Sequence, residues 1–111
     1  MQLPNSTKAY VDDRKLTEYC LNSEHEEGKH KARVFASALG ITSEIYFVLK
    51  AAILDVVLSE NAVFIKDLSS GKLYQVDFEM TYLDKSASVR SGWIILDNED
   101  FPRLPTCFVL T

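Results

Sequence analysis

Three side chains in this sequence are of the kinds that could cleave RNA without a metal ion: His25, Lys31 and Arg90. The reaction needs one group to take the proton of the 2′-hydroxyl, one to protonate the leaving oxygen, and cations to hold the charge that builds on the phosphate. An imidazole can accept or donate a proton near neutral pH, while a lysine and an arginine can hold a phosphate. We therefore assign His25 to proton transfer, and Lys31 and Arg90 to phosphate binding, in a candidate catalytic site.

Four more residues could complete such a site as substrate-binding groups: Lys15, Lys29, Arg103 and Thr106. The three catalytic candidates also have ordinary structural interpretations. His25 can be a solvated loop residue among carboxylates, and Lys31 a surface residue of a helix. Arg90 can pair with Asp77 or Glu79 across neighbouring strands. The sequence leaves both sets of interpretations open.

The segment Glu24–His30 does not have the spacing of a zinc site. His25 and His30 are five residues apart with Gly28 between them, so they would not share a helix face as the ligands of an HExxH motif do. Gly28 and Lys29 before a helix could cradle an anion, but the spacing is not that of a P-loop, and Gly28 is expected to serve turn geometry. There is no GxSxG elbow, CxxC pair or dinucleotide fingerprint. We expect neither a metal nor a cofactor.

The chain has the size and composition of a single domain spanning residues 1–111, with 47% hydrophobic and 25% charged residues. Its net charge of −4 argues against broad, salt-driven adsorption to nucleic acid, because such binding relies on a positive field. A local basic patch is still present, since residues 29–33 carry four basic side chains directly after the acidic residues 24–27. Charge is therefore segregated locally although the total is acidic.

No segment predicts membrane insertion or secretion. The apolar run at residues 41–58 is interrupted by three charged residues, which favours a buried helix over a membrane span. Residues 1–5 lack the basic start and apolar stretch of a signal peptide, so we expect a cytoplasmic protein. Cys20 and Cys107 lie far apart in the sequence and are expected to be reduced core residues in that compartment.

Helical periodicity predicts two helices in the first 40 residues. The first, at about residues 14–21, has a short apolar stripe, and Asp12 or Asp13 could cap its first free N–H groups. The second, at residues 29–39, has apolar side chains at i, i+3, i+4 and i+7, and Gly40 suits the left-handed position just beyond its end.

A third helix is predicted to begin after a cap at Thr42 or Ser43 and to end near residue 56. Its apolar stripe is widened until nearly every face is apolar. We therefore expect this helix at the centre of the fold.

After residue 61 the period of the pattern changes to two, which is typical of strands. The predicted strands cover residues 62–67, 74–82, 87–97 and 106–110. Trp93 shares a strand face with other apolar side chains and is expected in the core, and Pro105 is expected at a strand start or on an edge. The predicted fold is α+β, with about three N-terminal helices followed by a four-stranded antiparallel meander that the helices cover on one face.

Several short pieces, taken together in their order and spacing, resemble a family of small bacterial domains of unknown function. The pieces are Leu3-Pro-Asn5, Lys15-Leu16 with Tyr19, the block His25-x-x-Gly28-x-x-Lys31-Ala32 ending in Leu39-Gly40, Gly71-Lys-Leu-Tyr74, Val89-Arg90 followed by Gly92-Trp-Ile-Ile95, and Pro102-Arg103-Leu104 with Thr106. The resemblance covers nearly the whole chain. One departure is Glu26, where the family often has a proline after the histidine.

Related domains look like C-terminal modules of bacterial polymorphic toxins and like members of toxin–antitoxin-type gene pairs. The resemblance therefore implies a candidate metal-independent ribonuclease-like toxin domain, acting on RNA and held in check by a small cognate antitoxin or immunity protein. The alternative is a non-catalytic protein-binding module of a small bacterial gene pair, which the acidic total and an unpaired sheet edge favour. Whether His25, Lys31 and Arg90 converge in space discriminates the two functions, because only the ribonuclease requires it.

Overall fold

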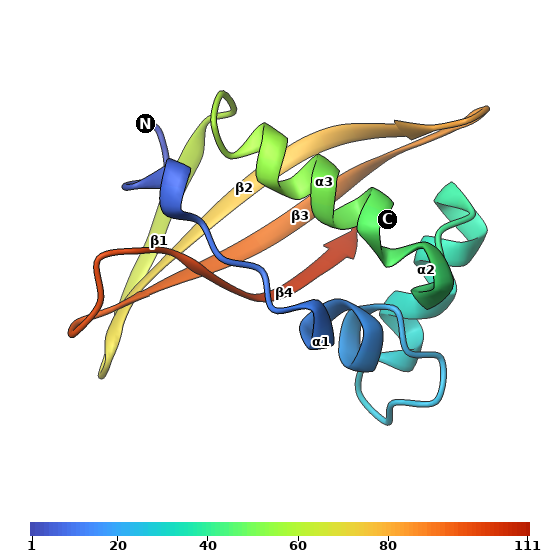
Figure 1. Ribbon diagram of the computed structural model, residues 1–111, viewed down its shortest axis with the longest axis horizontal. Coiled ribbons are helices and arrows are strands. Elements are labelled where there is room, and N and C mark those ends of the chain that lie inside the picture. The colour runs from blue at the N-terminus through green and yellow to red at the C-terminus, as the bar shows by residue number, and fades with distance from the viewer.

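The computed structural model describes residues 1–111 and has two layers, with helices on one face of a four-stranded antiparallel sheet (Figure 1). The α+β class and the order of helices before strands are confirmed. The helical elements are η1 (Ser6–Lys8), α1 (Asp13–Lys15), η2 (Leu16–Cys20), α2 (Lys29–Leu39), η3 (Ser43–Ile45) and α3 (Tyr46–Val56). The strands are β1 (Ala62–Leu68), β2 (Gly71–Tyr82), β3 (Lys85–Leu96) and β4 (Arg103–Val109).

The four strands pair in sequence order as a meander, β1-β2-β3-β4. All four predicted strands are present, and β2, β3 and β4 begin two or three residues earlier than predicted. On β2, Val76 and Phe78 are buried while Asp77 and Glu79 are exposed, as the alternating pattern requires. The strand β2 therefore has one face toward the helices and one polar face toward water.

The turn between β2 and β3 lies at Leu83 and Asp84. Leu83 is 82% exposed and has a φ of 56°, a left-handed conformation that leucine rarely adopts. The pairing of Tyr82 with Lys85 fixes this tight connection. Sheet register, and not local preference, therefore decides the conformation of Leu83.

The first predicted helix is formed by α1 and η2 together, which follow one another without a break. Asp12 caps it, since its carboxylate accepts the N–H of Arg14 at 3.0 Å. The second part, η2, is a π-helical turn in which Leu21 donates its N–H to the carbonyl of Leu16 at 2.8 Å.

The second predicted helix is confirmed as α2, with the predicted boundaries. Gly40 follows it with a φ of 68°, and its N–H bonds the carbonyl of Ala36 while the N–H of Ile41 bonds that of Phe35. This is the hydrogen-bond pattern of a glycine-terminated helix.

The prediction that the third helix is central is wrong. Leu49 and Ile53 of α3 are fully buried, but Phe47 is 58% exposed. The fold has only two layers, so α3 has the sheet on one side and solvent on the other. Thr42 also makes no side-chain capping bond, and the helix begins instead with the 3-10 turn η3.

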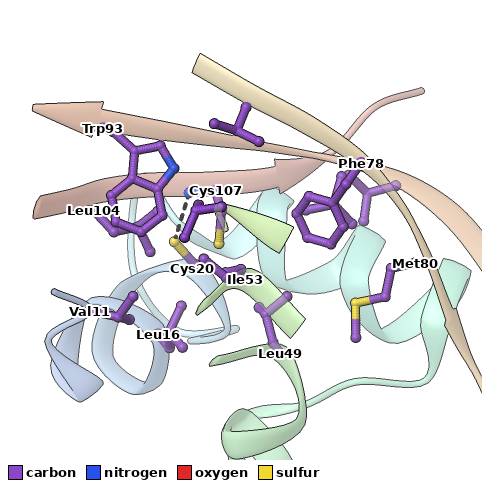
Figure 2. Close-up of a cluster of buried hydrophobic side chains, with 14 of the residues drawn as sticks. Val11, Leu16, Cys20, Leu49, Ile53, Phe78, Met80, Trp93, Leu104 and Cys107 are labelled. Carbon is purple, nitrogen blue, oxygen red and sulfur yellow. Dashed lines mark hydrogen bonds between the residues drawn. The ribbon is translucent and has the colours of Figure 1, made fainter. Parts of the chain in front are cut away.

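The core lies between the helices and the inner face of the sheet. Figure 2 shows Leu49 and Ile53 of α3 near Phe78 and Met80 of β2, with Trp93 of β3 further along the same layer. Trp93 is fully buried, as predicted. Its indole N–H donates to the hydroxyl of Ser91 at 2.9 Å, and that hydroxyl donates to the carbonyl of Val76 at 2.8 Å. The buried polar groups at this point are therefore satisfied.

The N-terminal segment covers the outer edge of β4. Tyr10 forms a parallel bridge with Arg103, donating its N–H to the carbonyl of Pro102 and accepting that of Leu104 at 3.1 Å. Pro105 lies on this edge strand beside an irregularity in the pairing with β3, which suits a residue without an N–H. No single helix is long and apolar enough to span a membrane; α2 with η3 and α3 reaches that length and composition only as a pair bent by 70°.

Candidate functional site

His25 lies in the loop between η2 and α2, where the backbone occupies one of its ring nitrogens. Its Nδ1 accepts the N–H groups of Glu27 at 3.0 Å and Gly28 at 2.9 Å. The ring also packs edge-on against Tyr19, with 4.9 Å between centroids. A ring that accepts two hydrogen bonds at Nδ1 carries its proton on Nε2 and has no free lone pair. In this arrangement the basic nitrogen of His25 faces the backbone, and its Nε2–H is the group that can donate a hydrogen bond.

Gly28 is required because the chain passes too close to η2 for a side chain. A Cβ atom at this position would lie 2.1 Å from the carbonyl oxygen of Tyr19. Gly28 lies in a turn, as expected, but its φ of −83° is one that any residue can adopt. Space, and not backbone conformation, selects glycine.

Lys31 of α2 contacts the same tyrosine. Its ammonium donates to the hydroxyl of Tyr19 at 2.9 Å and lies 4.9 Å from the centre of that ring. It is also 5.9 Å from the ring centre of Phe108 on β4. Tyr19 therefore brings His25 and Lys31 together. Tyr19 lies in the first predicted helix, and the sequence pattern did not indicate these contacts.

A cavity of about 290 Å³ opens beside this cluster and is lined by charged groups of both signs. Its lining residues are Asp12, Arg14, Lys15, Glu18, Tyr19 and His25. Asp12 and Arg14 pair at 2.8 Å, and this contact lowers the pKa of Asp12 to about 2. Lys15 makes no ion pair or side-chain hydrogen bond. Lys15 is thus the unpaired cation of this cavity, and Glu18 is its unpaired carboxylate.

Arg90 does not join the cluster. It alternates with the buried residues Val89 and Ser91, so it lies on the outer face of β3. There it forms a two-pronged pair with Asp77 on β2, with both N···O distances 2.9 Å, and this carboxylate raises the pKa of Arg90. This is the ion pair across neighbouring strands that the sequence allowed as the structural interpretation of Arg90.

The remaining candidates for substrate binding are dispersed. Arg103 is held by Glu99 through contacts of 2.7 and 2.6 Å, and its guanidinium lies against the rings of Tyr10 and Phe101. The Thr106 hydroxyl is buried without a hydrogen-bond partner. Lys29, at the first position of α2, lines a different cavity from that of Lys15. These groups do not form one substrate-binding surface with His25.

The two cysteines are both buried, as predicted, but they also lie next to each other, which their spacing did not indicate. The N–H of Cys107 donates to the sulfur of Cys20 at 3.4 Å (Figure 2). Hydrogen bonding from Cys107 lowers the pKa of Cys20 to about 7, and the same contact together with burial raises the pKa of Cys107. The pair joins η2 to β4.

A different kind of candidate lies at the other edge of the sheet, on β1. Val63, Phe64 and Ile65 are 52%, 43% and 42% exposed. The ladder of β1 with β2 is irregular between Phe64 and Lys66. No strand pairs with β1 on its outer side, and only Ala62 bonds another segment there, through the carbonyl of Met1. Three consecutive apolar side chains thus accompany an unpaired backbone edge.

Comparison with known proteins gives a family and no function. A family model described as a domain of unknown function (DUF6883) matches residues 2–111. No curated protein and no solved structure matches the chain. No group of three His, Cys, Asp or Glu side chains is arranged to hold a metal ion.

Proposed function

The chain belongs to the DUF6883 family, and from this premise we propose that it is a non-catalytic protein-binding module of a small bacterial gene pair, with β1 as its binding edge. The partner that this edge fits is a protein segment in extended conformation, such as a strand of a small antitoxin or immunity protein. Such a segment adds to an open sheet edge through main-chain hydrogen bonds, and apolar side chains provide selectivity.

One observation carries the proposal: the exposed run Val63–Ile65 on an unpaired edge strand. Natural sheets usually blunt their edges with charges, proline or a covering segment. At the β4 edge of this sheet Tyr10 bridges to Arg103, whereas β1 carries three exposed apolar side chains. The groups suggested for catalysis also support it, because His25, Lys31 and Arg90 each have internal partners.

The charges of the molecule indicate which side chains the partner segment should have. Each copy of the chain has a net charge of −4, which opposes the association of two copies. Next to the apolar run, Lys66 is exposed and unpaired, while Asp67 is paired with Lys72 at 2.7 Å. We therefore expect a partner strand with alternating apolar side chains and a carboxylate that reaches Lys66.

Selection from a random peptide library against the purified domain tests this function. Enriched peptides should share the alternating apolar pattern with an acidic residue. Their affinity should fall about tenfold or more for Ile65→Lys, and it should be unchanged for Phe47→Lys, a more exposed apolar position on α3. Peptides that bind both variants alike, or a domain that dimerises through β1, would contradict the proposal.

A second candidate, RNA cleavage by a toxin-like domain, is favoured by the cavity that Lys15, Tyr19 and His25 line together. In this arrangement the Tyr19 hydroxyl, held by Lys31, transfers the proton. Lys15 and the Nε2–H of His25 would hold the phosphate. This assignment moves proton transfer from His25 to Tyr19.

The RNA candidate is tested by incubating excess domain with transfer RNA and by expressing it in bacteria. Cleavage and growth arrest should occur with the wild type, disappear with Tyr19→Phe at equal protein level, and persist with Lys29→Ala. Intact RNA together with normal growth at high protein levels would end this candidate and leave the binding module standing.

A further inference from the structure

A cavity of about 230 Å³ lies where the N-terminal segment meets the ends of β3 and β4. Most of its wall is apolar and comes from the sheet, through Ile94, Leu96, Leu104 and Pro105. It is far in sequence from β1, and neither proposed activity uses its apolar wall. Its lining, an apolar wall with a few charged groups, is that of a pocket for a small organic molecule, and its volume leaves room only for a small one.

The charges at this cavity are compensated with one exception. Asp12 is paired with Arg14 at 2.8 Å, and Arg103 is paired with Glu99 at 2.6 Å. Lys15 also lines the cavity and has no ion pair or side-chain hydrogen bond. The pocket therefore offers one available positive charge beside an apolar wall.

We propose that this cavity binds a small organic monocarboxylate, with the carboxylate on the Lys15 ammonium and a short apolar chain against Ile94 and Leu104. A single cation matches one negative charge, and a carboxylate accepts charge-assisted hydrogen bonds from an ammonium. Each methylene group placed against the apolar wall adds affinity because it leaves water. A more highly charged anion, such as phosphate, would bring its second charge near Asp12 and bind more weakly.

Titration of the isotope-labelled domain with hexanoate, followed by NMR, tests the proposal. Hexanoate should give saturable shifts at the methyl groups of Ile94 and Leu104. Acetate, inorganic phosphate and hexan-1-ol should each bind at least about tenfold more weakly, since each lacks the apolar chain or the single negative charge. Equal binding of acetate and hexanoate, or shifts confined to other residues, would overturn it.

Variants of the exposed Lys15 separate the site from general charge effects. Lys15→Met keeps the length of the side chain and should weaken hexanoate binding about tenfold, while Lys15→Arg should retain it. Lys29→Met, which removes a charge elsewhere, should bind as the wild type does. An affinity for Lys15→Met equal to that of the wild type would refute the assignment. The result is independent of peptide binding at β1.

Discussion

The two edges of the sheet differ in how their backbone groups are treated. At β4, Tyr10 bridges to Arg103, and η2 and α2 pack nearby so that Cys107 is fully buried. At β1, the side chains of Val63–Ile65 remain exposed, and the only outer hydrogen bond involves Ala62. Both strands are seven residues long, so the difference lies in what covers them. One edge is built into the core, and the other is available to a partner.

The largest effect is expected where the sheet meets the covered edge. Trp93→Ala should lower the free energy of unfolding by about 3–5 kcal/mol, because it removes a fully buried ring and leaves a cavity. Urea denaturation followed by circular dichroism measures this without relying on tryptophan fluorescence. A loss below about 1 kcal/mol would show that the β4 side is not the tightly packed one.

A second test concerns the loop that packs η2 against α2. Gly28→Ala should destabilise the fold by about 3 kcal/mol, because the new methyl group would meet the Tyr19 carbonyl oxygen at 2.1 Å. Gly92→Ala is the matched control, since its methyl group would make ordinary contacts of 3.6 Å with Thr106. Equal stabilities of the two variants in urea would contradict the close approach at Gly28.

The buried hydroxyl of Ser91 gives a smaller effect. Ser91→Ala should cost about 2 kcal/mol, because it leaves the buried Trp93 N–H without an acceptor. Ser86→Ala, which removes an exposed hydroxyl pair with Thr81, should change stability by less than about 0.5 kcal/mol. Thermal unfolding of both variants distinguishes a buried network from a surface contact.

At the open edge, substitution should leave the fold unaffected. Ile65→Thr keeps a β-branched side chain on an exposed strand position, so the unfolding free energy should stay within about 0.5 kcal/mol of the wild type. Urea denaturation measures this, and the same variant should bind the selected peptides more weakly because an apolar edge residue is removed. A loss as large as that of Ser91→Ala would mean that β1 is already packed.

The weakest effect concerns pH at the covered edge. The contact with Arg14 lowers the pKa of Asp12 from 3.8 to about 2, so the carboxylate stabilises the fold above pH 4. This contribution should disappear as the pH falls from 4 toward 2. The stability difference between the wild type and Asp12→Asn, measured by urea denaturation, should therefore shrink over that interval. A stability difference between the two proteins that grows as the pH falls would contradict the lowered pKa of Asp12.

Much of the fold could be predicted because helices and strands follow from the short-range spacing of apolar side chains. The boundaries of α2 and the alternation along β2 follow from side-chain spacing that one helix or one strand face requires. The central position expected for α3 failed because apolar composition does not say how many layers surround a helix. The candidate site was less predictable, since the contacts of Tyr19 with His25 and Lys31 depend on loop geometry.

The sequence by itself determined the class of the fold, the order of its elements and which faces of the strands are wet, because these depend on residues a few positions apart. Only the tertiary structure revealed the hydrogen bond of Cys107 with Cys20, the ion pair of Arg90 with Asp77 and the bridge of Tyr10 to β4. Such contacts join segments 13 to 93 residues apart and leave no periodic pattern in the chain. The same long-range pairing decided that β4 is covered while β1 stays open.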